Sequence, residues 1–209
     1  MYSLTGESEK AEEAATSTVA HSVEHGYPYF ESMGTIFLGI ALATKGESQA
    51  GAELISKGLD DFHRTGARIL TPFFHIRWAE VMGQLGQIEE GLSLLREALA
   101  TIESKGEHNA EAEAYRLQGM LLLAQDGSHN AQVAEASFHR ALTIAREQQA
   151  KSWELRVASS LAHLWQSQGK RQDARELLEP VYGWFTEGFD TADLIDAKTL
   201  LDELEEVAS

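Results

Sequence analysis

The sequence predicts an all-α protein, a right-handed superhelix of antiparallel helical hairpins that repeats about every 40 residues. Three observations predict it. Ala, Leu, Glu and Gln dominate the composition and favour helices, and the 209 residues include only three prolines. Glycines recur at turn positions, and small residues recur between them at the same period. No long alternation of β-branched residues indicates a strand.

Helix boundaries are expected at glycines and prolines, because glycine ends helices and proline suits their first turn. The boundary residues are, in chain order, Gly26, Pro28, Gly46, Gly66, Pro72, Gly86, Gly106 and Gly169. The expected helices cover residues 7–25, 29–45, 47–63, 72–86, 88–105, 109–125, 131–149, 151–168, 171–187 and 191–207. The connections are short, so neighbouring helices should pack antiparallel.

We therefore expect a single domain over residues 1–209. Residues 7–25 form a leading helix and residues 191–207 form a capping helix. Between them, four helical hairpins are expected at residues 29–63, 68–105, 109–149 and 151–187.

The repeat is carried by four series of residues that step by 40, with a single step of 43. The series are Gly39, Ala79, Gly119 and Ala162; Gly51, Gly91, Ala134 and Ala174; Ile55, Leu95, Phe138 and Leu178; Gly58, Ala98, Ala141 and Val181. All four place a three-residue insertion within residues 126–131. Two helices approach to about 8–10 Å only where small residues lie at the crossing, so these positions predict the helix crossings.

In two copies the triplet reads Ala134, Phe138, Ala141 and, 40 residues later, Ala174, Leu178, Val181. A small residue, a larger apolar residue and a second small or apolar one, after a turn glycine, resemble the tetratricopeptide repeat (TPR). The period of 40 departs from the usual 34 residues, and the proline that usually closes each second helix is absent. The resemblance implies a TPR-like solenoid that binds a protein or peptide.

A sharper resemblance covers residues 130–206, which include the stretch VYGWFTEGFDTADL. It is similar to the C-terminal end of bacterial multidomain proteins that join a cyclase or DNA-binding domain to an ATPase and then to TPRs. This implies a non-catalytic interaction or sensor module in the regulatory part of a bacterial signalling protein. No G-x-x-x-x-G-K-[ST] phosphate-binding loop occurs here. Because residues 2–5 resemble the tail of a preceding helix, we expect a fragment of a longer parent or a truncated relative.

The charge and composition exclude several classes of function. A formal net charge of −16 repels nucleic-acid phosphates and anionic membrane surfaces, so we expect neither partner. The chain has no cysteine, so disulfides and cysteine-ligated zinc are excluded. We see no signal peptide and no run of about 18 apolar residues. We expect a cytoplasmic protein without a cofactor, and apolar surface at its N-terminal end makes self-association an expectation.

The concave face, lined by the first helix of each hairpin, is the predicted binding groove. Its expected contact residues are Met33, Ile36, Ile40, Phe73, Ile76, Glu80, Arg116, Met120, Arg156 and His163. The apolar N-terminal half could accept an amphipathic helix. Alternatively, Arg116 and Arg156 could anchor an anionic small molecule, which would make the protein a sensor. A third interpretation pairs these arginines with Glu113 and Glu154 on a hydrated surface.

His21-Ser22-Val23-Glu24-His25 matches the H-x-x-E-H string of inverted zinc peptidases. Two histidines four residues apart on a helix could ligate zinc, with Glu24 as the base. A third ligand does not stand out in the sequence. We therefore expect no enzyme and no metal, and we keep a zinc-dependent hydrolase at His21, Glu24 and His25 as the alternative.

Overall fold

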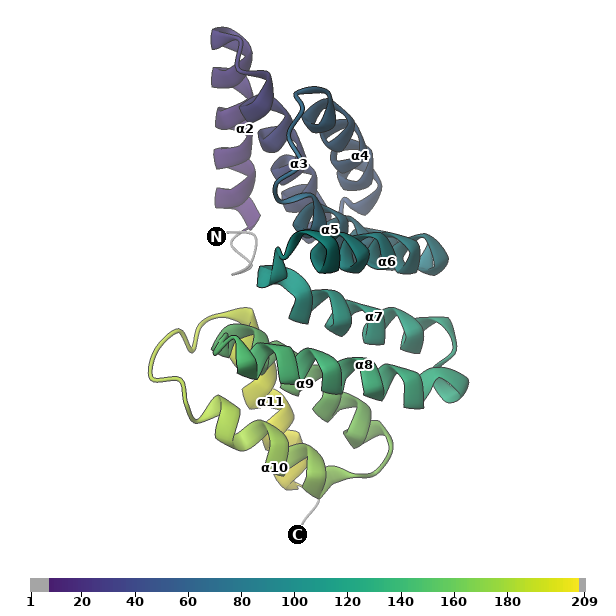
Figure 1. Ribbon diagram of the computed structural model, residues 1–209. Coiled ribbons are helices and arrows are strands. Elements are labelled where there is room, and N and C mark those ends of the chain that lie inside the picture. Colours follow the sequence, from purple (N-terminus) through teal and green to yellow (C-terminus); the bar gives the residue numbers. More distant parts are fainter. Residues whose placement is uncertain (1–7, 207–209) are drawn as a thin grey trace. The chain divides into compact units, whose positions relative to one another are not determined.

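The computed structural model describes residues 8–206, which form ten α-helices and one 3₁₀ turn, without a strand in that range (Figure 1). The helices are α2 (Ser8–His25), α3 (Pro28–Thr44), α4 (Ser48–Arg64), α5 (Thr71–Gln84), α6 (Ile88–Lys105), α7 (Glu111–Gln125), α8 (Gly127–Glu147), α9 (Lys151–Ser167), α10 (Arg171–Tyr182) and α11 (Ala192–Glu206). The all-α prediction is confirmed. The expected trace of a preceding helix at residues 2–5 lies outside the described residues. None of the described helices combines the length and apolarity needed to cross a bilayer.

Two helix boundaries differ from the sequence prediction. Helix α8 begins at Gly127 instead of residue 131, because the Asp126 side chain accepts a hydrogen bond from the backbone N–H of His129 and caps the helix. The three-residue insertion thus becomes most of an additional helical turn. Helix α10 ends at Tyr182 instead of residue 187, two residues after the internal Pro180.

The described chain divides into two compact units, residues 1–110 and 111–209. In the first unit, α2 packs on α3, α3 and α4 form one hairpin, and α5 and α6 form the next (Figure 1). The hairpin α3/α4 is joined by an unusually close crossing. A Cβ atom on Gly39 would lie 2.6 Å from the carbonyl oxygen of Gly51, and a Cβ on Gly51 would lie 2.6 Å from that of Gly39. The helices α3 and α4 therefore cross at Gly39 and Gly51, as the series that begin at these two glycines predict.

Large apolar side chains fill the space around that crossing. Ile55, Phe62 and Phe74 are fully buried, and the rings of Phe62 and Phe74 meet edge to face at 5.5 Å between centroids. Burial of an aromatic ring stabilises the fold by about 1.5–3 kcal/mol relative to exposure. The second hairpin repeats the arrangement with Leu95 and Ile102.

In the second unit, α7 and α8 form a hairpin, as do α9 and α10. The crossing of α7 and α8 places Gly119 under the ring of Phe138, whose Cε1 atom would lie 2.6 Å from a Cβ added to that glycine. Ala134, Phe138 and Ala141 are fully buried together with Leu161 of α9. The small–large–small triplet therefore works as a helix-crossing device, as its spacing predicts.

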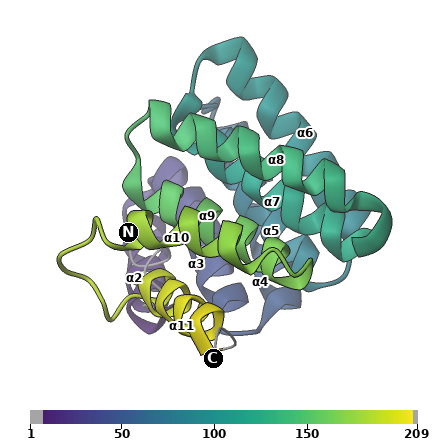
Figure 2. The same cartoon turned by 90° about the horizontal axis from the view of Figure 1, so that it is seen from below.

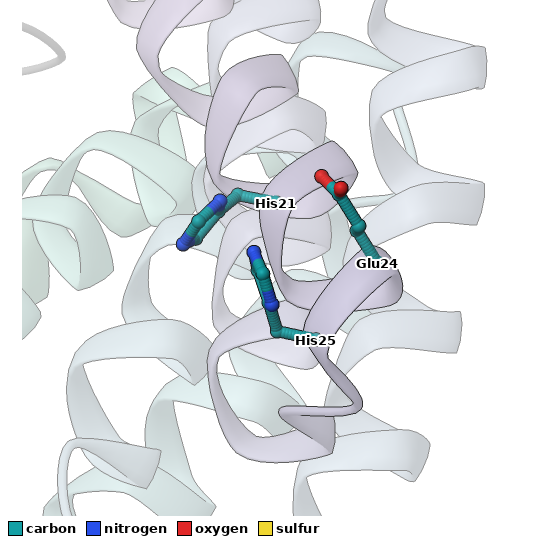
Figure 3. Close-up of side chains that lie close together, drawn as sticks. All are labelled: His21, Glu24 and His25. Atoms are coloured by element: carbon teal, nitrogen blue, oxygen red, sulfur yellow. The ribbon is translucent and has the colours of Figure 1, made fainter.

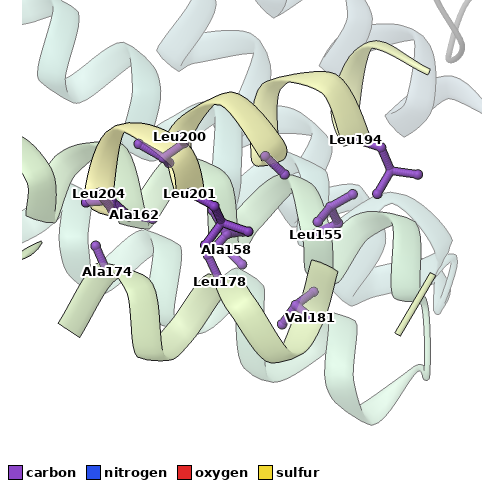
Figure 4. Close-up of a cluster of buried hydrophobic side chains, with 11 residues drawn as sticks. Leu155, Ala158, Ala162, Ala174, Leu178, Val181, Leu194, Leu200, Leu201 and Leu204 are labelled. Carbon is purple, nitrogen blue, oxygen red and sulfur yellow. The ribbon is translucent and has the colours of Figure 1, made fainter. Parts of the chain in front are cut away.

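Helix α11 closes the second unit against α9 and α10 (Figure 2). Its buried residues join a cluster from all three helices (Figure 4): Leu155, Ala158, Ala162, Ala174, Leu178, Val181, Leu194, Ala197, Leu200, Leu201 and Leu204. Forty residues beyond Ala162, where the crossing series would continue, α11 has Asp202. Asp202 is exposed and forms an ion pair with Lys198. The crossing position of α11 therefore carries a charged residue where the earlier copies have glycine or alanine.

Candidate functional site

A surface cavity of about 450 Å³ lies in the first unit, between α4, α5 and the start of α6. Its apolar wall is made by Ala52, Trp78 and Met82, of which Ala52 and Met82 are buried. The margin of the cavity is polar and exposed. On α4 it consists of Glu53, Lys57, Asp60 and Arg64, and at the start of α6 it consists of Gln87 and Glu90. An apolar wall with a charged margin is typical of a site that holds one anchoring side chain of a ligand.

The charges at this margin are mixed but mainly acidic. The margin has three acidic residues, Glu53, Asp60 and Glu90, and two basic residues, Lys57 and Arg64. Arg64 is itself paired with Asp61, so part of its charge is compensated. The margin therefore favours a ligand with positive charge.

Trp78 adds an unusual feature to the cavity wall. Its Nε1 is buried and finds no hydrogen-bond partner within the described part of the chain. An unsatisfied buried donor costs about 1–3 kcal/mol, so this indole N–H is a local cost to the stability of the first unit. The sequence does not reveal this cavity, because its lining comes from three helices and its margin has the composition of ordinary solvated surface.

The residues predicted for the groove in the first unit are largely inaccessible. Ile36, Ile40 and Ile76 are 0%, 2% and 1% exposed, which corrects the expectation that they form surface contacts. These side chains are buried because they point into the protein. Ile36, for example, packs against Gly58 of α4, and a Cβ atom added to Gly58 would lie 2.6 Å from Ile36 Cγ1. Of the rest, Met33 and Phe73 are half-buried.

Glu80 completes the predicted set in the first unit. It lies on α5 and forms an ion pair with Arg77, one turn earlier on the same helix. Its carboxylate is thus engaged within the unit, and only Met33 and Phe73 remain as accessible apolar candidates of this half of the groove.

In the second unit, Arg116 and Arg156 are brought together by a buried carboxylate. Glu113 is 1% exposed, and both of its oxygens accept hydrogen bonds from Arg116, at 2.7 and 2.8 Å. Arg156 donates to Glu113 Oε1 at 3.1 Å and to Asp193 of α11 at 2.9 Å. Arg116 also donates to the Ser160 hydroxyl at 3.2 Å. This charge network holds α7, α9 and α11 together.

The expected pairing of these arginines on a hydrated surface is therefore corrected in two respects. The shared carboxylate of Glu113 is buried, and Glu154 does not contact either arginine. Instead, Glu154 accepts hydrogen bonds from Arg146 at 2.8 Å and Lys151 at 2.6 Å. Burial alone would raise the pKa of Glu154, but the hydrogen bonds and charges of Lys151 and Arg146 outweigh it and lower that pKa.

Helix α11 covers the polar half of the predicted groove. Asp193 pairs with Arg156, and His163 Nε2 lies 3.4 Å from Asp196 Oδ1. Because Glu113 and Asp193 already pair with the two arginines, the arrangement does not favour an external anion at Arg116 and Arg156. Met120, which is 43% exposed, and the exposed His163 remain candidates for partner contact.

Among the other described histidines, His75 of α5 is the one most affected by burial. Its Nδ1 is buried and lies 4.0 Å from Glu97 Oε2. Burial lowers the pKa of His75, and the nearby Glu97 carboxylate only partly opposes that effect. His75 is therefore neutral at pH 7.

The histidines of the H-x-x-E-H string gather at the C-terminal end of α2 (Figure 3). One donor atom from each of His21, Glu24 and His25 lies within 4.8 Å of the other two. The two imidazole centroids are 4.3 Å apart, edge to face, and the ring of Tyr27 stacks on His25 at 6.0 Å. All three residues are exposed, and within residues 8–206 this is the one group of three such side chains.

Comparison with known proteins gives structural neighbours but no sequence family. No protein-family model and no curated protein matches the chain. The structure resembles BtubC (BKLC) from P. vanneervenii, with a TM-score of 0.68 and 14% identity over 96% of this chain and 91% of that one.

Two further neighbours support the same fold. A crystal structure of nearly identical TPR-like repeats of a Podosopora anserina kinesin light chain has a TM-score of 0.60 and 22% identity, over 87% of this chain and 88% of that one. The apo form of RapI has a TM-score of 0.63 and 14% identity, over 96% of this chain and 77% of that one. These likenesses confirm the TPR-like helical-repeat fold.

Proposed function

We propose that the chain is a non-catalytic protein-interaction module, and that the cavity between α4, α5 and α6 holds the anchoring side chain of its partner. The cavity of about 450 Å³ is the observation that supports this proposal. It combines an apolar wall with a charged, exposed margin. The TPR-like fold supports it, since stacked hairpins present extended surfaces for protein partners.

The partner that fits this site is a basic amphipathic helix. The net charge of −16 attracts a positively charged segment, and Glu53, Asp60 and Glu90 supply acceptors at the margin. A leucine or aromatic side chain of that helix would contact Trp78 and Met82, as amphipathic helices do in apolar grooves.

A randomised library of helical peptides selected on the intact protein tests the proposal. Selected peptides should carry one large apolar residue flanked by lysine or arginine. Ser56 of α4 also lines the cavity, so Ser56→Arg should fill it and weaken their binding at least tenfold. Glu90→Lys should weaken binding severalfold by charge reversal. Ser152→Arg on α9 and Glu103→Lys on α6, both exposed, are the matched controls. Equal binding by Ser56→Arg and Ser152→Arg would remove the cavity as the binding site.

A narrower proposal rests on the resemblance of residues 130–206. It places the module in the regulatory C-terminal part of a cytoplasmic bacterial signalling protein, with an ATPase or cyclase domain upstream. The coding sequence upstream of Met1 in the source genome tests it. The organisation of the chain as one continuous domain stays a prediction. Self-association also stays a prediction, and the concentration dependence of the sedimentation coefficient tests it.

A further inference from the structure

We propose that His21, Glu24 and His25 form a binding site for a divalent transition-metal ion of the zinc class. The three residues lie on the last two turns of α2 (Figure 3). In the sequence, His21 and His25 are four residues apart and Glu24 directly precedes His25. Positions i and i+4 share one helix face, so the two imidazoles are placed side by side by the backbone. This inference is independent of the proposed cavity, which lies between α4, α5 and α6.

The donor atoms need only a small adjustment to bind an ion. They lie within 4.8 Å of one another, whereas ligands around a tetrahedral zinc ion, at about 2.0–2.1 Å from the metal, are separated by about 3.3 Å. All three side chains are exposed, so rotations about their χ angles can close this difference without disturbing the core. The ring of Tyr27 stacks on His25 and limits the directions in which that imidazole can turn away.

The chemistry of the donors selects the class of metal. Two imidazole nitrogens and one carboxylate suit Zn²⁺, Ni²⁺ and Cu²⁺, whereas Mg²⁺ and Ca²⁺ prefer sites made of oxygen ligands. The chain has no cysteine, so no thiolate competes for the ion. Bound imidazoles must be neutral, so metal binding should weaken as the solution is acidified.

The arrangement assigns Glu24 a different role from the one in the peptidase string. There the glutamate acts as a base beside the metal, whereas here its carboxylate lies with the imidazoles as a third ligand. Three protein ligands leave one tetrahedral position for water or for a donor from another molecule. The site is therefore an exposed, exchangeable metal site and has no enclosing cleft of its own.

Isothermal titration of the full chain with Zn²⁺ at pH 7.5 tests the site. We expect one equivalent of Zn²⁺ to bind, at least tenfold more weakly in His21→Gln and in His25→Gln. Glu24→Gln should weaken binding severalfold. His129→Gln is the matched control, because His129 is also exposed and its Nδ1 lies 2.9 Å from a carboxylate oxygen of Asp126.

Several results would overturn the site. They are an absence of saturable Zn²⁺ binding, a Zn²⁺ affinity in either His21→Gln or His25→Gln that falls by less than tenfold, and a loss of affinity in His129→Gln as large as theirs. An unchanged affinity in Glu24→Gln would overturn the three-ligand form of the proposal. Copper titration followed by electron paramagnetic resonance gives a second readout: two coupled nitrogens are expected in the wild type and one in His25→Gln. Circular dichroism of each variant confirms that the helices are retained.

Discussion

Replacement of Gly39 by alanine should destabilise the first unit, although alanine is the better helix former. The added Cβ would lie 2.6 Å from the carbonyl oxygen of Gly51, 2.9 Å from Ile55 Cγ1 and 3.0 Å from the Ile55 backbone nitrogen. Two of these three atoms belong to the backbone of α4 and cannot rotate away. The helices must therefore separate by about 0.6 Å, and a gap of that size already forfeits a quarter or more of each van der Waals contact along the hairpin.

The magnitude follows from two opposed terms. Overpacking a core costs about 1–3 kcal/mol, and the backbone contacts place this variant near the upper value. Alanine regains about 1 kcal/mol of helix propensity over glycine. The expected net loss is about 2 kcal/mol, or a decrease of about 4–8 °C in Tm for a chain of this size.

Two other glycines make a graded series with Gly39. At Gly119 the new methyl would meet the movable ring of Phe138, so the expected net loss is smaller, about 1 kcal/mol. Nothing lies within 4 Å of a Cβ at Gly127, so alanine there should stabilise by about 0.5 kcal/mol. Thermal unfolding followed by circular dichroism, with hydrogen exchange of α3 and α4, measures the order. A Gly39→Ala protein as stable as Gly127→Ala would refute the close-packing argument.

Three further predictions concern ionisable groups. Glu113→Gln should lower the free energy of unfolding by about 2–4 kcal/mol, measured in urea, because Arg116 loses its buried partner; an effect below about 0.5 kcal/mol would contradict this. The low pKa of Glu154 implies stability that is complete above pH 4.5 and lost as pH falls through the lower folded value, so Glu154→Gln should flatten the acid limb of the urea midpoint. His75 has a pKa below 6.5 in the fold, so its contribution is present above pH 6.5 and decreases as pH falls; His75→Gln should reduce the decline in Tm between pH 6.5 and about 5.

Much of the helical framework could be predicted because it depends on spacing. The 40-residue step places Gly39 and Gly119 at helix crossings. In the structure, a Cβ atom at either position would lie only 2.6 Å from an atom of the partner helix. The insertion near residue 126 could also be inferred from the sequence, because every series shifts by the same three residues. Its conversion into a turn of α8 was missed, because Asp126 was interpreted as part of a loop and not as a helix cap.

The candidate sites were harder to predict, because they depend on which helix a side chain faces. Repeat register places Ile36 on a first helix, but its rotation toward α4 is set by the glycines of the partner helix. Likewise, the carboxylates that take up Arg156 come from α7 and α11, 43 residues before it and 37 after it. Only the His21–His25 cluster is local in sequence, and the structure brings donor atoms of His21, Glu24 and His25 within 4.8 Å of one another.

Helix α11 has a consequence for association between molecules. Helical-repeat proteins can join end to end when the last helix offers a neighbour the same small, apolar crossing that its own repeats use. In α11 that position is Asp202, bound to Lys198 on the exposed face. Docking another hairpin there would strip water from both charges, which costs more than the exposed pair can return. The face of α11 that carries Asp202 is therefore unsuited to docking a further hairpin, and an engineered array that used this face would have to begin by replacing Asp202 with glycine or alanine.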